Sequence, residues 1–299
     1  MWVWIARGAG SYSPRFMPIA TTNKQSAVGA RLAGDPSSNI LPTPPFAALV
    51  TNRYISRTSD TLRERLDMTD TLFRDDSYLK DCDATVTGID GDSIILDRTV
   101  FYPMGGGQPG DTGSISWDGD AARVIDTRYG EAGAIRHIVA PGSAIPSIGS
   151  RVRATIEWDR RYRHMRMHTA LHLLGAVLRY GVTGGNIGAD RSRLDFDMED
   201  TIEKDTVSAA MQALVDANHP VRCRWISDAE LEAQPELVRT MSVQPPKGAG
   251  RVRLLEIENV DLQPCGGTHL KSTGEVGRVS VTKVEKKGRR NRRVYIELV

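Results

Sequence analysis

His168-Thr-Ala-Leu-His172 places two imidazoles four residues apart in a stretch, residues 165–180, whose apolar side chains recur at helical spacing. Residues i and i+4 lie on the same face of a helix, so both rings can point at one ion. Far downstream, Cys265-Gly-Gly-Thr-His269 places a thiol and an imidazole around a Gly-Gly pair, which suits a tight turn. If both segments bind one ion, they must meet in the core of a single domain.

The two segments together offer a set of metal ligands, namely His168, His172, Cys265 and His269. Three imidazoles and one sulfur favour tetrahedral zinc, and we expect one Zn²⁺ per chain. Only six histidines occur in the chain, and three of them fall in this set. The plain alternative is a helix with two incidental histidines and an unrelated buried cysteine.

Other zinc chemistries fit the sequence poorly. A zincin requires His-Glu-x-x-His, whereas Thr169 follows the first histidine here. A zinc deaminase requires Pro-Cys-x-x-Cys, and Pro264-Cys265 is followed by no second cysteine at that spacing. A structural zinc finger holds its ligands within a few tens of residues, much closer than these two segments lie.

The composition is that of a soluble globular protein. The chain has 299 residues, of which 25% are charged and 40% hydrophobic, and this length allows two modest cores. It holds no run of about 18 apolar residues, so we expect no membrane span. Three cysteines, one of them in the expected metal set, argue against a disulfide framework and for a reducing compartment. We therefore expect a cytoplasmic protein, and we expect it to be a monomer.

Basic residues fall in two clusters, although the net charge is only +2. One cluster lies near the C-terminus and comprises Lys283, Lys286, Lys287, Arg289, Arg290, Arg292 and Arg293. The other leads into the histidine pair and comprises Arg160, Arg161, Arg163 and Arg166. Each cluster alone is typical of a solvated surface, whereas two clusters around one metal site also fit a polyanionic partner.

Residues 1–67 show no sustained apolar period and mix Ser, Thr, Gly, Pro and Arg with few acidic residues. We expect this segment to be a disordered extension, or a translated upstream region with Met68 as the working start. An Arg-rich, acid-poor start also fits an organellar transit peptide, which is the less favoured interpretation.

Residues 68–148 are expected to form a small antiparallel β-barrel. Residues 84–97 are typical of a hairpin, and further short strands are predicted near 113–117, 122–127 and 134–139. Residues 141–149 read as a linker.

Residues 149–299 mix strands and helices without strict βαβ alternation, which indicates an α+β domain. A strand at 151–158 precedes the histidine helix, and a second helix is predicted at 201–217. Further strands are predicted at 191–197, 221–226, 252–257, 276–284 and 293–298.

Five motifs, in order along residues 70–299, resemble those of the stand-alone alanyl-tRNA editing proteins, the AlaX family, and of the editing domain of alanyl-tRNA synthetase. Besides the two metal segments, they are Phe101-Tyr-Pro-Met-Gly-Gly-Gly-Gln108-Pro, Arg193-Leu-Asp-Phe196 and Lys287-Gly-Arg-Arg-Asn-Arg-Arg293. Leu171 stands where synthetase copies usually carry a hydroxyl residue, which favours the stand-alone form. Met104 replaces a Thr or a small residue, and the synthetase's glutamine has no clear match among residues 183–187.

The resemblance implies hydrolysis of the aminoacyl ester of tRNA(Ala) mischarged with serine, and in some cases glycine. It implies roles in catalysis for Gln108, His168 and His172, and in zinc binding for the four ligands. The residues expected to contact the tRNA or its amino acid are Gly105, Gly106, Gly107, Thr183, Asn186, Arg193, Lys286, Lys287, Arg289, Arg290, Arg292 and Arg293. The basic C-terminal loop is expected to hold phosphates of the acceptor stem.

Two alternatives from other classes remain open at this stage. One is a nucleic-acid-binding module whose zinc is purely structural, which the same basic clusters support. The other is a zinc hydrolase acting on a small ester or amide. Hydrolysis of charged tRNA, with and without a chelator, separates these alternatives from the editing enzyme.

Overall fold

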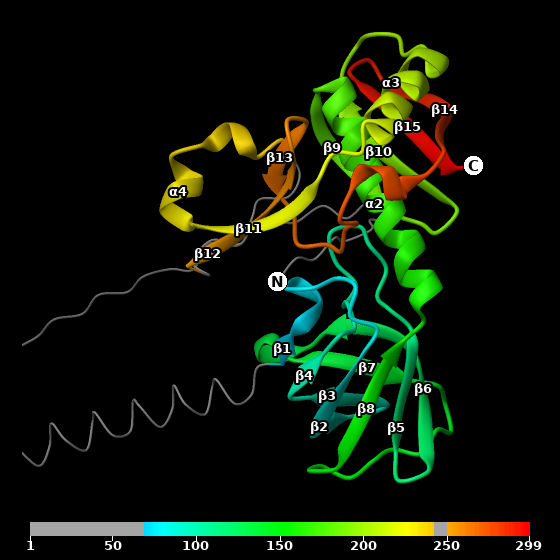
Figure 1. Cartoon of the computed structure of the whole chain (residues 1–299), viewed down its shortest axis with the longest axis vertical. Coiled ribbons are helices and arrows are strands. Elements are labelled where there is room, and N and C mark those ends of the chain that lie inside the picture. Colours follow the sequence, from blue (N-terminus) through cyan, green and yellow to red (C-terminus); the bar gives the residue numbers. More distant parts are fainter. Residues whose placement is uncertain (1–68, 242–249) are drawn as a thin grey trace, which may run out of the picture. The chain divides into compact units, whose positions relative to one another are not determined.

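The structure is a computed structural model that describes residues 69–241 and 250–299 (Figure 1). The expected extension, residues 1–67, lies outside the described residues. Within the described ranges, no helix is long and apolar enough to cross a bilayer.

The first part of the described chain is a closed six-stranded antiparallel barrel, as the sequence predicted (Figure 1). Around the barrel the strand order is β2-β3-β7-β6-β5-β8. The bounds are β2 (Asp81–Asp90), β3 (Ser93–Leu96), β5 (Gly113–Trp117), β6 (Asp120–Tyr129), β7 (Ile135–Val139) and β8 (Arg151–Ile156). Two short strands beside it, β1 (Asp70–Thr71) and β4 (Arg98–Thr99), pair in parallel.

The strand β8 corrects the expected domain boundary. We expected it to begin the second domain, but it pairs with both β2 and β5 and thereby closes the barrel. Its even-numbered residues Val152, Ala154 and Ile156 are buried in the barrel core, so its alternating pattern serves the barrel. The division into two domains stays a prediction, with its boundary after residue 156 rather than before residue 149.

The rest of the described chain mixes helices with two antiparallel sheets, which fits the expected α+β class. One sheet has the order β14-β15-β10-β9, with β9 (Gly181–Asn186), β10 (Arg191–Asp197), β14 (Val279–Gly288) and β15 (Asn291–Leu298). The other has the order β11-β12-β13, with β11 (Val221–Ser227), β12 (Arg251–Ile257) and β13 (Asp261–Pro264). The helices are α2 (Trp158–Leu178), α3 (Lys204–Asp216) and α4 (Asp228–Glu232).

The long helix α2 carries the histidine pair and forms the centre of the second core. Every residue from Met167 to Ala176 is buried, so the helix is covered on all sides. Its Leu173 and Leu174 belong to the same cluster as Phe196 and Ile296 of the larger sheet. The helix begins at Trp158, earlier than the predicted start at residue 165, and the arginines at 160–166 therefore lie on it.

Arg161 joins this helix to the barrel through a buried ion pair. Its guanidinium is fully buried and binds the Asp111 carboxylate through Nε and Nη2. The same guanidinium donates to the carbonyls of Ser77 and Val100, at 3.0 and 2.6 Å. Asp111 in turn accepts a 2.7 Å bond from the Tyr102 amide, so one buried network fixes the loop that leads to the Gly-rich motif.

Replacing Asp111 with alanine is expected to lower the free energy of unfolding by about 3–5 kcal/mol, because Arg161 would keep a buried charge without its counter-ion. Urea denaturation measures this loss. The matched control is Asp83→Ala, which breaks the exposed pair with Arg153 and should change the value by less than about 0.5 kcal/mol. Equal stability of the two variants would show that the buried pair does not hold the two parts together.

Candidate metal centre

Four side chains from two distant segments meet in the second core. His168 and His172 lie on one face of α2, and Cys265 and His269 lie on the loop after β13. Their ligand atoms all lie within 4.8 Å of one another. The Cys265 Sγ lies 3.1 Å from His269 Nε2 and 3.5 Å from His168 Nε2. Nitrogen and sulfur ligands of tetrahedral zinc lie about 3.5 Å apart, so these two distances are close to those of such a site.

Gln108 of the Gly-rich motif orients the first imidazole. Its Oε1 lies 3.0 Å from His168 Nδ1 and accepts a 3.2 Å bond from the Thr268 amide, while its Nε2 donates to Thr268 Oγ1 at 2.8 Å. With its N–H on Nδ1, His168 leaves the Nε2 lone pair for a metal. Gln108 is fully buried and its amide is used by these contacts. Its geometry therefore fits a positioning role through His168 better than the direct role in catalysis that the resemblance implies.

The other two imidazoles are held in the same way. Asp261 Oδ2 lies 3.2 Å from His172 Nδ1, and Arg239 lies 3.1 Å from the second carboxylate oxygen. Thr169 Oγ1 lies 3.4 Å from His269 Nδ1. All three rings therefore use Nδ1 for protein contacts and present Nε2 to a common point, as ligating histidines do.

The electrostatics of the cluster favour a bound cation. Burial alone would raise the pKa of the Cys265 thiol, but His168 and His269 hold that pKa well below its ordinary value, which yields the thiolate that metals require. Burial would lower the pKa of His172, but its bonds to Asp261 and Cys265 raise it to about 9. Burial and the neighbouring His168 hold the pKa of His269 well below its ordinary value. Two anions thus face three imidazoles, of which one readily carries a positive charge.

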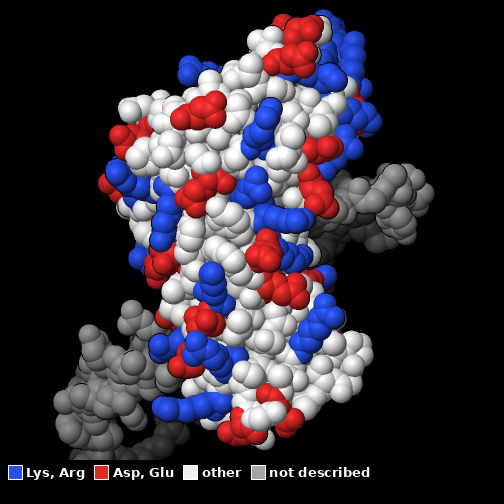
Figure 2. Space-filling model, turned by 45° about the vertical axis from the view of Figure 1, so that its right-hand side comes forward, with Lys and Arg blue, Asp and Glu red and all other residues white. Residues whose placement is uncertain are grey.

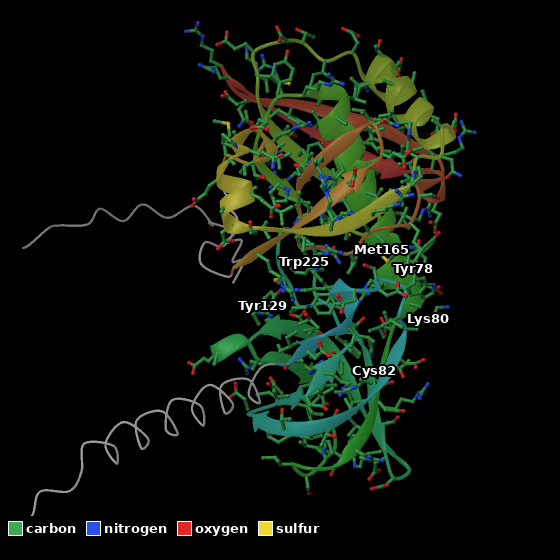
Figure 3. All side chains as sticks on the ribbon, turned by 60° about the vertical axis from the view of Figure 1, so that its left-hand side comes forward. Tyr78, Lys80, Cys82, Tyr129, Met165 and Trp225 are labelled. Atoms are coloured by element: carbon green, nitrogen blue, oxygen red, sulfur yellow. The ribbon has the colours of Figure 1, made fainter. Side chains whose placement is uncertain are left out.

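The centre opens into a cavity on one side. His168, His172 and Cys265 line this cavity, together with Gly266 and Gly267 of the cysteine turn. The remaining lining comes from barrel and second-core residues, namely Arg74, Tyr102, Gly105, Gly106, Tyr129, Leu171, Gly175, Tyr180, Val182, Gly185, Asn186, Ile187, Leu194, Arg239, Thr240, Gln263 and Pro264. Figure 3 shows Tyr129 of this lining at the end of β6. A metal at the centre would be accessible from the cavity.

The Gly-rich loop contributes to the cavity unevenly. Gly105 and Gly106 line it, but the Gly105 amide is used within the turn, where it donates to the Gln108 carbonyl at 3.1 Å. The Gly107 carbonyl accepts a 2.9 Å bond from the Ile187 amide, which attaches the loop to the end of β9. Among the described residues, no hydrogen bond uses the Gly106 amide, so this is the amide that can reach a ligand. Met104 of the same motif is exposed and lies outside the cavity lining.

Of the two expected contact residues at 183–187, one reaches the cavity. Asn186 lines it, whereas the Thr183 hydroxyl donates to the Asp195 carbonyl at 3.2 Å and accepts from Asn291 at 3.0 Å. Arg193 is likewise engaged elsewhere, because it binds both carboxylate oxygens of Asp195 at 2.8 and 2.7 Å.

The basic C-terminal segment is not the free loop that we expected. The strands β14 and β15 extend through most of it, and only Arg289 and Arg290 form the turn. Arg292 is buried and donates to backbone carbonyls, including that of Asp200, and Arg293 binds Asp195 with two 2.8 Å bonds. Both arginines are engaged within the sheet: Arg292 is buried, and the partly exposed Arg293 is held by the Asp195 carboxylate. Basic and acidic side chains alternate over the face seen in Figure 2.

Several residues of the site were missed from the sequence. Asp261, Thr169 and Gln263 surround the ligands, and Arg239 and Tyr180 line the cavity. Thr169 lies inside the motif His168-Thr-Ala-Leu-His172, so its position next to His168 in sequence could have predicted a role near the metal ligands. Asp261 and Gln263 are close to the cysteine in sequence, but their role depends on the hairpin β12–β13, which we did not predict.

Comparison with known proteins identifies the family of this chain. The alanyl-tRNA editing protein AlaX-M of Methanosarcina acetivorans is 38% identical over 245 residues, which cover 78% of this chain and 100% of that protein. The chain belongs to the AlaX family. AlaX-M of Saccharolobus solfataricus is 35% identical over 236 residues, covering 76% of this chain and 98% of that protein. The resemblance inferred from the five motifs is thus confirmed.

Members of the synthetase group match parts of the same region. The alanine–tRNA ligase of Pyrobaculum aerophilum is 39% identical over 231 residues, which cover 72% of this AlaX chain and 25% of that ligase. Residues 61–160 match the class II (A) tRNA synthetase family, and residues 252–295 match the threonyl and alanyl tRNA synthetase second additional domain. The second match spans the cysteine turn and the C-terminal strand pair.

Proposed function

We propose that this AlaX protein hydrolyses the aminoacyl ester of tRNA(Ala) mischarged with serine, with glycine as a second substrate. The observation that carries the proposal is a four-ligand centre that opens into a cavity, in a chain whose relatives are named alanyl-tRNA editing proteins. Free amino acid and tRNA would be the products. The reaction is a hydrolysis and uses no ATP.

Two features of the centre fit zinc. Its donors are three imidazole nitrogens and one thiolate, a set that suits zinc, and every imidazole is already turned with Nε2 toward the common point. We propose that His168, His172, Cys265 and His269 hold one Zn²⁺. When bound, zinc would polarise the ester carbonyl or lower the pKa of a water at the centre. Because three of the four ligands line the cavity, we favour this role over a purely structural one.

The residues of the chain bind and orient the ester around this centre. The Gly106 amide makes no hydrogen bond among the described residues and belongs to the cavity lining, where it can donate to an oxygen atom of the substrate. The Gln263 side chain also lines the cavity, but it already donates to Asp261 and contacts His172. Asp261 binds both His172 and Arg239, so it fixes the imidazole and the guanidinium relative to each other. We propose that these groups position the ester, and that Gln108 acts through His168 without touching the substrate.

Selection of serine requires a polar partner for its hydroxyl. A synthetase pocket made for alanine rejects a slightly larger or smaller amino acid poorly, so a second site must do the sorting. Asn186 lines the cavity, and we propose that it binds the serine hydroxyl. Asn186 is exposed in the free protein, and a bound ester would cover it. An alanyl ester lacks the hydroxyl and would leave the covered amide unpaired, at a cost of about 1–3 kcal/mol.

We propose the acceptor stem of tRNA(Ala) as the partner of this AlaX protein. The exposed basic residues that remain available for its phosphates are Lys286, Lys287, Arg289 and Arg290. Some of these carry surface ion pairs, such as Lys287 with Glu285 at 2.8 Å, which phosphates can replace. A monomer in the cytoplasm, where charged tRNA is used, completes the proposal.

The test is hydrolysis of Ser-tRNA(Ala) by the purified protein, with Ala-tRNA(Ala) as the matched substrate. We expect the seryl ester to be hydrolysed about 10–100-fold faster, the range that one unpaired hydroxyl partner allows. Retention of the tRNA without hydrolysis would identify a binding module instead. Hydrolysis of small seryl esters with no response to the tRNA would identify a small-molecule hydrolase.

Replacing Gln108 with leucine is expected to weaken zinc binding by about 10–100-fold, because His168 would lose the acceptor that fixes its tautomer. Competition with a chromophoric chelator measures the affinity directly. Gln108→Glu is the matched control, since a carboxylate still accepts from His168 Nδ1 and from the Thr268 amide. If the leucine variant kept the parent affinity while the fold was intact, the positioning role of Gln108 would be wrong.

A further inference from the structure

Gly175 is a glycine that the packing of α2 does not require. It is buried within the helix, and its backbone does not adopt a positive φ. A Cβ built on it meets no atom of the described residues within 4 Å. Its carbonyl accepts the Arg179 amide at 2.9 Å, a bond that any residue could make. Glycine is a poor helix former, so its presence here calls for a different reason.

The space in front of Gly175 belongs to the cavity of the metal centre. His168, His172 and Gly175 follow one another on a single face of α2 at spacings of four and three residues. All three line the cavity, as does Leu171. Gly175 therefore lies about one helical turn, roughly 5 Å, beyond His172 along the helix axis. A side chain at this position would project into the cavity.

The cavity that Gly175 lines also has apolar walls. Tyr180 and Val182 follow the end of α2 closely in sequence. Leu194 packs over Gly185 of β9: a Cβ added to Gly185 would lie 2.9 Å from the Leu194 Cδ2. All three side chains line the cavity and are partly exposed. Thr240 forms a bridge with Val182 and adds a hydroxyl to the lining. An apolar slot with one aromatic ring and a polar margin suits a flat heteroaromatic ligand.

We propose that this slot binds the terminal adenine base of the tRNA and that Gly175 determines the specificity for it by leaving the slot open. The inference rests on the proposed function, which places the ester at the metal centre. A ribose ring then spans the one helical turn between the ester and the base. The faces of adenine can stack on Tyr180 and pack against Val182 and Leu194. The serine side chain is the poorer occupant, because it is too small to cover these apolar walls and cannot stack on the Tyr180 ring.

The test compares two seryl esters, one with the base and one without it. The esters are 2′(3′)-O-seryl-adenosine and serine methyl ester, and the variants are Gly175→Ala and Gly175→Leu. For Gly175→Leu we expect kcat/KM for seryl-adenosine to fall at least about 10-fold further than kcat/KM for the methyl ester, relative to the parent. For Gly175→Ala we expect a smaller fall in kcat/KM for seryl-adenosine and a Tm about 2–4 °C higher, since alanine is the better helix former. Zinc content should stay at the parent value in both variants.

Two outcomes would overturn the slot. Equal losses on both esters in Gly175→Leu would show that the space takes the aminoacyl group, and unchanged kcat/KM values would show that the substrate does not enter it. Failure of the proposed function looks different, because the parent protein would then hydrolyse neither Ser-tRNA(Ala) nor seryl-adenosine. In that case an NMR-monitored titration with adenosine tests whether the slot binds the base. Binding that Gly175→Leu abolishes would support the slot, and absence of binding to the parent would overturn it.

Discussion

Replacing Cys265 with alanine is expected to abolish stoichiometric zinc binding and to lower the stability of the protein. The thiolate is the anionic ligand among the four, and His168 and His269 already hold its pKa well below the ordinary value. If free zinc exceeds its dissociation constant about 1,000-fold, binding stabilises the fold by about 4 kcal/mol, and the variant would lose this contribution. Metal analysis and urea denaturation, each with and without added zinc, measure the two effects.

Cys223→Ala is the matched control for this experiment. Cys223 is exposed on β11 and lies outside the ligand cluster, so its loss should leave zinc content and zinc-dependent stability at the parent values. Full zinc occupancy in Cys265→Ala would refute the ligand assignment.

Gly267→Ala is expected to disrupt the centre although it removes no ligand. A Cβ at this position would lie 2.2 Å from His168 Cε1 and 2.4 Å from His168 Nδ1, far inside the contact distance. It would also lie 3.0 Å from Gln108 Oε1, so the ring cannot move without breaking the bond that orients it. We expect zinc affinity to fall by at least about 100-fold, because both a ligand and its partner are displaced.

The control for this prediction is Gly288→Ala. No atom of the described residues lies within 4 Å of a Cβ on Gly288, and its φ is not positive, so alanine should be tolerated there. Chelator competition on the two variants gives the comparison. Parent affinity in Gly267→Ala would mean that the cysteine turn is looser than the structure has it.

The sequence was most informative where local spacing determines geometry. The i, i+4 pair His168 and His172 needs only a helix to share a face, and the barrel hairpins follow from strict alternation and turn residues. The strand β9 escaped prediction because its residues Gly181–Asn186 are rich in glycine, which has low strand propensity. It forms because β10 supplies the ladder partner, and no local pattern reports that contact.

The differences between the expected and the observed contacts at the site have a common physical cause. Arg292 and Arg293 read as free basic groups, but the carbonyls and the Asp195 carboxylate that bind them come from β10 and its flanking loop. Gln108 was expected to act in catalysis, but its partner His168 is 60 residues away in sequence. Which group a polar side chain contacts depends on tertiary packing. Residue types alone therefore indicated which chemical groups the site contains, but not which partner each group binds.

The central claim is that this AlaX protein is a zinc-dependent deacylase, and single-turnover hydrolysis of Ser-tRNA(Ala) tests it most directly. The rate is measured on the protein as purified, after removal of metal by a chelator, and after stoichiometric zinc is restored. We predict that the chelated protein loses hydrolysis while it still binds the tRNA, and that zinc restores the rate. Undiminished hydrolysis by protein shown to be free of metal would contradict the account.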